Sequence, residues 1–107
     1  MTGLQLLNLM LENDVEIKEN HVDLIAEFDS AIKEKRVYFI PNGNTIIGFC
    51  TWERKNGKGF INKCVIYKEF RSRFSMIEIR KYFRELFKDL DGIYWKSKRR
   101  NRICSVR

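Results

Sequence analysis

The feature that most constrains the fold is a basic turn between an apolar run and an amphipathic run. Residues 60–67 are apolar and rich in strand-favouring residues, while residues 76–90 carry apolar side chains at helical spacing. Ser75 precedes the second run and Glu78 follows three positions later, which is the Ser-x-x-Glu pattern of a capping box. The sequence therefore predicts a strand, a short turn and a helix in direct succession.

The predicted turn also has the chemistry of an anion site. Free backbone N–H groups and the positive end of the helix dipole meet at a helix N-terminus. Arg71 and Arg73 add positive charge just before the cap. These features favour a phosphate or another anion, although a strand–turn–helix unit that binds nothing carries the same signals.

Length and composition indicate one folded domain spanning residues 1–107. Apolar residues make up 44% of the chain and aromatic residues 13%, a composition typical of a globular protein. No apolar run approaches the roughly 18 residues that span a membrane, and the N-terminus lacks the pattern of a secretory signal. We therefore expect a protein of the cytoplasm (the host cytoplasm if the chain is viral) without a membrane partner.

Cysteine and histidine usage argues against a metal site. Cys50, Cys64 and Cys104 are far apart, no Cys-x-x-Cys is present, and His21 is the only histidine. Each cysteine lies in an apolar segment typical of a strand, so we expect reduced, buried thiols.

The net charge of +7 is distributed unevenly along the chain. Residues 1–50 carry 4 basic and 8 acidic side chains, whereas residues 51–107 carry 17 basic and 6 acidic ones. A basic half of this kind favours an anionic partner, such as nucleic acid, a phosphorylated cofactor or an acidic protein surface. Pairing between the two halves is the alternative explanation.

Two helices are expected before the first strand, over residues 4–11 and about 21–35. Asn20 supplies an N-cap for the second helix. The inner face of that helix is predicted from four apolar residues at helical spacing, namely Val22, Ile25, Phe28 and Ile32.

The rest of the chain predicts an antiparallel meander followed by a strand–helix–strand crossover. Asn-Gly pairs at positions 42–43 and 56–57 are strong hairpin signals. The expected strands are residues 37–40, 45–53, 60–67, 93–96 and 103–106. Because a helix connects the third and fourth strands, these two are expected to run parallel. The fold class is therefore α+β, with a mixed α/β arrangement.

This order of elements resembles the GCN5-related N-acetyltransferase (GNAT) family, and three short segments carry the resemblance. Residues 44–52 are similar to the family's hairpin strand with its Gly-Phe pair, and residues 65–71 to the strand that enters the cofactor loop. Residues 71–76 fall at the position of that loop. The resemblance extends over about residues 37–95 and implies a short member of the family. High Lys, Ile, Asn and Phe content suits a phage product.

The resemblance implies that acetyl-CoA binds at the turn and that an acetyl group passes to an amine of a protein or small molecule. In the family, backbone amides of the loop hold the pyrophosphate of the cofactor at the start of the helix. The positions that match this region are Val65, Ile66, Tyr67, Arg71, Ser72, Arg73, Phe74, Ser75 and Met76. Phe74 and Met76 stand where the family has glycines, so side chains face the expected phosphate contacts.

Acetyl transfer also needs a base for the amine and an acid for the departing thiolate. Relatives often place a glutamate on the strand before the loop, but residues 60–67 contain no acid. Glu53 is the nearest substitute as the base, and Tyr94 is a candidate acid. A surface glutamate and a core tyrosine are the alternative interpretations of these two residues.

A second hypothesis is a GNAT-like domain without catalysis that binds nucleic acid. Its basic half would contact phosphates and its aromatic side chains would stack on bases. The clearest basic cluster consists of Lys96, Lys98, Arg99, Arg100 and Arg102. A third hypothesis is an interaction protein that binds a host or viral protein, or that forms an oligomer.

Overall fold

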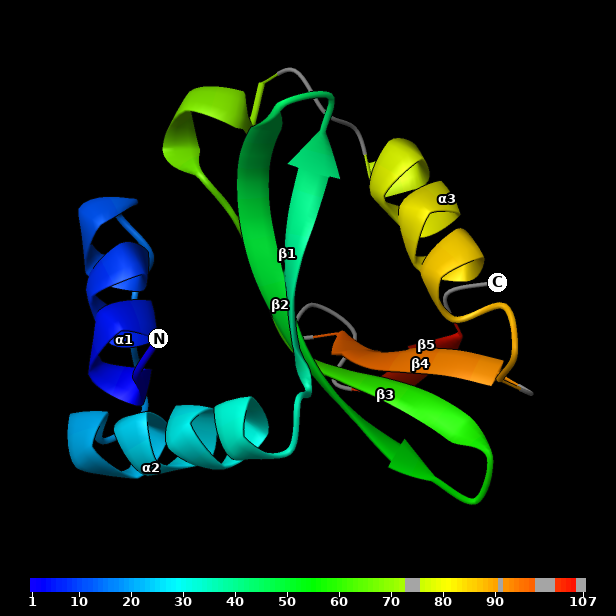
Figure 1. Ribbon diagram of the computed structural model, residues 1–107, viewed down its shortest axis with the longest axis horizontal. Helices are drawn as coiled ribbons and strands as arrows, with labels where there is room; N and C mark the ends of the chain where they lie inside the picture. The colour runs from blue at the N-terminus through cyan, green and yellow to red at the C-terminus, as the bar shows by residue number, and fades with distance from the viewer. Residues whose placement is uncertain (73–75, 91, 98–101, 106–107) are drawn as a thin grey trace.

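The computed structural model describes residues 1–72, 76–90, 92–97 and 102–105, and these residues form a mixed α+β architecture (Figure 1). The elements are α1 (Gly3–Glu12), α2 (His21–Lys33), β1 (Val37–Asn42), β2 (Thr45–Lys55), β3 (Lys58–Ile66), the 3-10 turn η1 (Lys68–Phe70), α3 (Met76–Leu86), β4 (Gly92–Ser97) and β5 (Arg102–Ser105). None of the described helices has the length and apolar composition needed to cross a membrane.

The strands form one sheet in the order β1-β2-β3-β4-β5. β1, β2 and β3 make an antiparallel meander, β3 and β4 are parallel, and β5 returns antiparallel to β4. β3 and β4 can run parallel because α3 carries the chain back along the sheet between them. The predicted meander and the parallel crossover are confirmed.

Two-residue turns set the register of the meander. Asn56 and Gly57 have φ values of 53° and 77°, the positive values that a type I′ hairpin turn requires at both central positions. Gly43 in the first hairpin has a φ of 62°. Asn42 ends β1 and pairs with Thr45, so the first turn is Gly43-Asn44, whereas the second turn is the Asn56-Gly57 pair itself. Both Asn-Gly pairs nevertheless located their hairpins, because glycine and asparagine tolerate positive φ.

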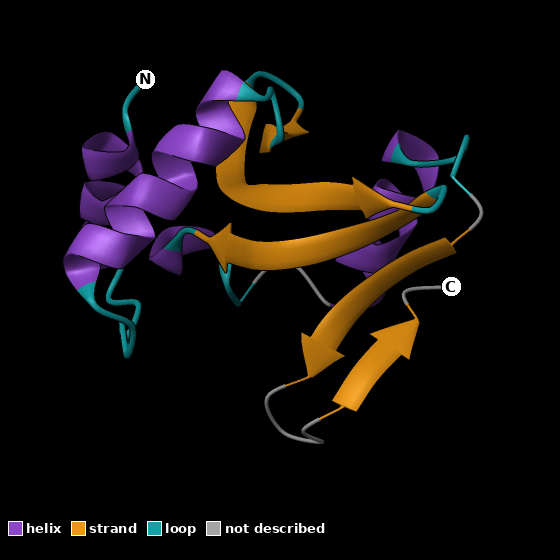
Figure 2. Ribbon diagram, turned by 90° about the horizontal axis from the view of Figure 1, so that it is seen from below, coloured by secondary structure: helices purple, strands orange, loops and turns teal. Residues whose placement is uncertain are grey.

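The two faces of the sheet are covered by different helices (Figures 1 and 2). One hydrophobic cluster joins α1 and α2 to Phe49 and Val65 of the sheet. The other joins α3 to the opposite face, where Cys50, Ile61 and Ile93 are buried. Because side chains alternate along a strand, neighbours such as Phe49 and Cys50 enter different clusters.

The expected inner face of α2 is wrong at Val22, which is 74% exposed. The buried residues of this helix are Leu24, Phe28 and Ala31, which follow one stripe with spacings of four and three. At 100° per residue, Val22 lies about 200° around the helix from Leu24, so it cannot share that stripe. The predicted N-cap is confirmed, because the Asn20 side chain accepts hydrogen bonds from the helix N-terminus.

The helix after the basic turn is shorter than expected. α3 ends at Leu86, before the predicted stop at the Asp-Gly pair of positions 91–92. Leu90 is nevertheless buried against the sheet, as its apolar spacing predicted, and Phe87, which the predicted stripe omitted, is buried as well. The chain therefore keeps its apolar contacts through a turn after the helical hydrogen bonds have ended.

Thr51 provides a test of this packing. Its side chain is 1% exposed, and its hydroxyl has no hydrogen-bond partner within the described part of the chain. Valine keeps the branched shape and removes an unsatisfied polar atom. We expect Thr51→Val to raise the free energy of unfolding by about 1 kcal/mol in urea denaturation.

Thr45→Val is the matched control, because Thr45 is exposed at the start of the same strand. It should change the free energy of unfolding by less than Thr51→Val does. A destabilised Thr51→Val protein would contradict the prediction and would indicate a buried partner for the hydroxyl.

Candidate functional site

β3 is paired along its whole length on one edge and along only part of its length on the other. Its pairing with β2 runs from Lys58 to Ile66. Its parallel pairing with β4 runs from Lys58 to Ile61 only. Within the described residues, positions 62–66 of β3 therefore face no strand on the β4 side.

A bulge in β3 lies where this parallel pairing ends. Thr51 pairs with Lys63 and the next residue of β2, Trp52, pairs with Ile61, so Asn62 has no residue opposite it. A bulge of this kind bends the strand and increases its local twist. We infer that the extra residue turns the second half of β3 away from β4 and opens the two parallel strands.

The alternation of backbone hydrogen bonds shows which groups face the opening. The Tyr67 N–H donates to the Ile47 carbonyl of β2 at 2.8 Å, so every second residue before Tyr67 also faces β2. Cys64 and Ile66 consequently direct their N–H and C=O groups toward the open edge. The Ile66 carbonyl follows this rule, because it accepts a hydrogen bond from Arg71 Nε at 2.9 Å.

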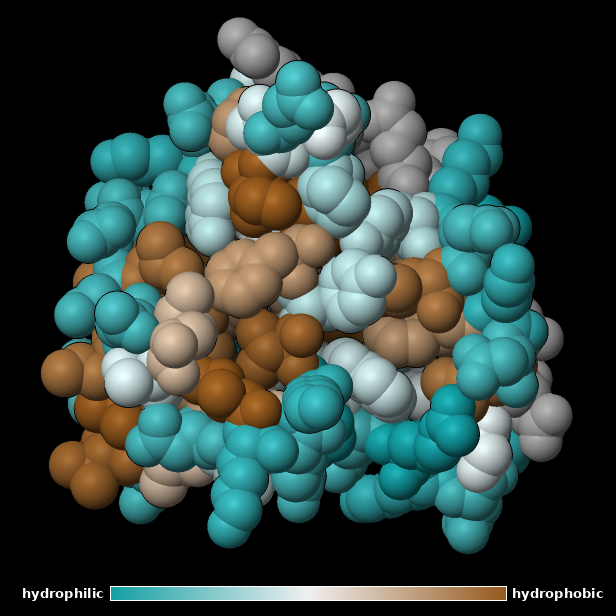
Figure 3. Space-filling view, viewed as in Figure 1, coloured by the Kyte–Doolittle hydropathy of each residue, from teal (hydrophilic) through white to brown (hydrophobic). Residues whose placement is uncertain are grey.

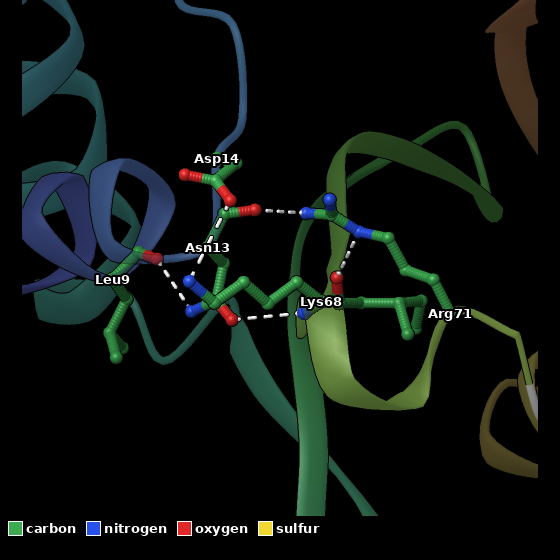
Figure 4. Close-up of polar contacts among 6 residues, drawn as sticks. Leu9, Asn13, Asp14, Lys68 and Arg71 are labelled. Carbon is green, nitrogen blue, oxygen red and sulfur yellow. Dashed lines mark hydrogen bonds and ion pairs between the residues drawn. The ribbon is translucent and has the colours of Figure 1, made fainter.

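The turn after β3 is attached to the end of α1 through Asn13 and Arg71 (Figure 4). The Arg71 side chain donates to the Ile66 carbonyl and, through Nη2, to the Asn13 carbonyl. The Lys68 N–H donates to Asn13 Oδ1 at 3.0 Å, and Asn13 Nδ2 donates to the Leu9 carbonyl at 2.8 Å. The start of this turn is thus held by the Asn13 side chain, and its end by the two backbone carbonyls that Arg71 binds.

The predicted cofactor residues of β3 direct their side chains into the core. Val65 is buried and Tyr67 is partly buried in the cluster of α1 and α2, and burial raises the pKa of the Tyr67 phenol. Ile66 packs against the cluster of α3 on the other face. A ligand between β3 and β4 would therefore contact their backbone rather than their side chains.

The other predicted cofactor residues are placed only in part. Arg71 is engaged with the two backbone carbonyls described above, Ser72 is exposed, and Met76 is the first residue of α3. Arg73, Phe74 and Ser75 lie outside the described residues, so their assignment to a cofactor loop stays a prediction.

The two catalytic candidates share one face of the sheet. Glu53 pairs with Phe60, and Phe60 pairs with Tyr94, so the three side chains form a row across β2, β3 and β4. The Glu53 side chain is 35% exposed and lies 3.5 Å from Lys55 Nζ. A Cβ added to Gly92 would lie 2.8 Å from Tyr94 Oη, so the phenol is directed toward the start of β4 and away from the opening.

The basic cluster predicted for nucleic acid is described at its two ends only. Lys96 belongs to β4 and Arg102 to β5, and these two strands pair antiparallel. Lys98, Arg99 and Arg100 lie outside the described residues. Binding of nucleic acid by this cluster stays a prediction.

Two asparagines have roles that the sequence interpretation missed. Asn13 lies just after the first expected helix, and Asn62 lies inside the expected strand of residues 60–67. An asparagine within a strand is a weak signal of a bulge, because its intrinsic strand preference is low. The contact of Asn13 with Arg71 had no local signal, because the two residues are 58 positions apart.

One of the two thiols near the opening is buried, that of Cys50, and the other, that of Cys64, is partly buried. Cys50 and Cys64 are free and lie opposite each other on β2 and β3. Burial raises the pKa of Cys64 to about 11, and burial with the nearby Cys64 raises the pKa of Cys50 further. A thiol that stays protonated is a poor nucleophile. Across the described residues, no three His, Cys, Asp or Glu side chains gather as a metal site.

The thiols predict an alkaline loss of stability. In the unfolded chain both thiols would ionise near pH 9, whereas folded Cys64 stays protonated to about pH 11. The folded state therefore binds more protons in this range, and its stability falls as the pH rises from 9 to 11. We expect the melting temperature to fall over this range, as measured by circular dichroism.

The melting temperature of Cys64→Ala should fall less between pH 9 and pH 11 than that of the wild-type chain, whatever the stability of the variant at pH 7. An identical pH dependence in the two proteins would contradict the assignment to this thiol.

The Arg71 contacts predict a structural cost when this residue is changed. Arg71→Ala removes the hydrogen bonds to the Ile66 and Asn13 carbonyls and should lower the free energy of unfolding by about 1 kcal/mol. Arg71→Lys should lower the free energy of unfolding by less than Arg71→Ala does. It should not match the wild-type chain, because an ammonium group lacks the planar fork that reaches both carbonyl oxygens. Urea denaturation provides the measurement.

Arg54→Ala is the control, because it removes an exposed arginine whose ion pair with Asp89 at 3.2 Å lies at the surface. Equal effects of Arg54→Ala and Arg71→Ala would contradict the proposed attachment of the turn.

Comparisons with known proteins do not identify a family. No protein-family model matches the chain, and no curated protein matches it significantly. The function proposed below therefore rests on the geometry of β3, β4 and the turn before α3.

Proposed function

We propose that this domain has a GNAT-like arrangement, binds an acyl-CoA between β3 and β4, and transfers its acetyl group to an amine. The observation that supports this most is the opening of the parallel pair beyond Ile61, next to the Asn62 bulge. The opening leads directly to the turn and to the N-terminus of α3. A linear ligand with an anionic end fits this order, in which the opening between β3 and β4 is followed by the turn and the N-terminus of α3.

The open edge of β3 offers partners for the pantetheine arm of coenzyme A, which carries two amide groups. An extended chain can pair with an unpaired strand edge through backbone hydrogen bonds. Cys64 directs its N–H and C=O groups toward this edge. The pyrophosphate would then lie at the turn before α3, where helix N–H groups favour anions. This placement uses backbone groups and does not require a free Arg71.

The reaction joins the amine nitrogen to the thioester carbonyl carbon and breaks the bond between that carbon and sulfur. The amine must lose a proton, and the departing thiolate gains one. A second N–H of the β3 edge, apart from the Cys64 N–H that pairs with the pantetheine arm, is suited to stabilise the carbonyl oxygen as negative charge develops. Glu53 is the better supported of the two catalytic candidates, because its carboxylate is partly exposed. Tyr94 is less suited as the acid, because its ring lies over Gly92.

Isothermal titration calorimetry with acetyl-CoA tests binding. We expect a dissociation constant in the micromolar range and a rise in melting temperature with ligand concentration. Arg73→Ala should weaken binding about fivefold through loss of a phosphate contact, and Arg54→Ala, which removes the same charge from β2, should not. Absence of heat and of any thermal shift at millimolar acetyl-CoA would overturn the proposal.

Turnover is tested separately by following release of free coenzyme A in the presence of primary amines, with Glu53→Gln as the variant. Glu53→Gln should lower kcat at least tenfold and leave acetyl-CoA affinity unchanged. Binding without turnover toward any amine would retain the cofactor site and reject the transferase.

A further inference from the structure

The sheet face opposite α3 is covered by helices over only part of its area. α1 and α2 pack on β1, β2 and the end of β3, through Phe39, Phe49 and Val65. Phe60 and Tyr94 lie on the same face, since their neighbours Ile61 and Ile93 point into the α3 cluster. Both aromatic side chains remain partly exposed. Figure 2 shows β4 and β5 extending away from α1 and α2.

Phe60 and Tyr94 form an aromatic pair on the part of this face that no described helix covers. They are directly paired residues of parallel strands, and their rings stack with centroids 5.5 Å apart at an interplanar angle of 29°. Gly92 permits this, because a Cβ there would lie 2.8 Å from the Tyr94 ring. The glycine therefore leaves room for the Tyr94 ring to lie along the start of β4. We call these two rings the aromatic platform.

Lysines of the β2–β3 hairpin adjoin the aromatic platform. Lys55 follows Glu53 by two residues, Lys58 precedes Phe60 by two, and the two lysines pair with each other. Both lysines therefore lie on the same face as Glu53 and Phe60, about 7 Å along the strands from that row. Both lysines are exposed, and Lys58 Nζ lies 5.7 Å from the Tyr94 ring centroid. The lower right of Figure 3, where this hairpin lies in Figure 1, is dominated by hydrophilic side chains.

We propose that the aromatic platform, together with Lys55 and Lys58, is a binding surface for single-stranded nucleic acid. Unpaired bases stack on exposed aromatic rings of a sheet, while flexible lysines contact the phosphates beside them. Duplex nucleic acid suits this surface poorly, because its bases are stacked internally. Among the described neighbours of the rings, two lysines, Lys55 and Lys58, face one carboxylate, that of Glu53, which lies 3.5 Å from Lys55 Nζ. This surface lies at the paired end of β3 and β4, in the same row as the catalytic candidate Glu53, and nucleic-acid binding is therefore measured without acyl-CoA.

Fluorescence anisotropy with labelled dT20 and rU20 tests the proposal on the full chain. We expect micromolar affinity at 50 mM salt that weakens steeply as salt is raised. Phe60→Leu keeps an apolar side chain but removes the ring, and it should weaken binding about tenfold. Lys58→Gln should reduce the slope of log K against log salt by about one unit.

Matched controls separate stacking and local charge from general effects. Tyr38→Leu removes a 39% exposed ring from β1, and Lys33→Gln removes an exposed lysine from α2. Both variants should bind as the wild-type chain does. Circular dichroism establishes whether each variant is folded. If Phe60→Leu is not folded, Phe60→Tyr replaces it. Phe60→Tyr keeps an aromatic ring and is expected to retain binding.

Three outcomes would overturn the proposal. The first is absence of binding to both oligonucleotides at 50 mM salt. The second is equal affinity for a 20-base-pair duplex or heparin, which would indicate attraction of charge without stacking. The third is an unchanged affinity in folded Phe60→Leu, or its loss in Phe60→Tyr.

Discussion

The pairing of β3 is the constraint on which the rest of the structure depends. This strand is antiparallel to β2 over its full length and parallel to β4 only from Lys58 to Ile61. The extra residue Asn62 makes both arrangements compatible, because it bends the strand after the parallel pairing has ended. The proposed acyl-CoA site lies beyond this bend, and the aromatic platform lies before it. One irregularity in one strand thus separates two surfaces of different chemistry.

Contacts between the two oppositely charged halves of the chain hold the end of β3 in place. Lys63 Nζ lies 2.9 Å from a Glu19 carboxylate oxygen, and Lys68 Nζ lies 3.6 Å from Asp14 (Figure 4). Arg71 adds one hydrogen bond to the same loop between α1 and α2, at the Asn13 carbonyl. The uneven distribution of charge is therefore explained in part by pairing inside the molecule. Lys58 of the β2–β3 hairpin lies away from this loop and is exposed, whereas Lys55 beside it is paired with Glu53 at 3.5 Å.

Local signals predicted most of the fold. The Asn-Gly pairs, the Asn20 cap and the apolar spacing of residues 76–90 each depend on a few neighbouring residues, and each located its element. The exceptions have physical reasons. Val22 fits a helical apolar pattern but lies on the wrong side of α2, because the side facing the sheet is decided by packing. α3 ends early while Leu90 still reaches the core, because burial does not require helical hydrogen bonds.

The sequence by itself determined the fold class, the order of the elements and the position of the basic turn between β3 and α3. These follow from turn chemistry, capping and periodicity, which act over a few residues. Only the tertiary structure decided that Arg71 bonds backbone carbonyls, that Asn62 is a bulge and that Phe60 stacks on Tyr94. Each of these depends on strand register or on residues far apart in the chain. The turn that most constrained the fold therefore located a candidate site, whereas long-range pairing decided which of its groups remain available to a ligand.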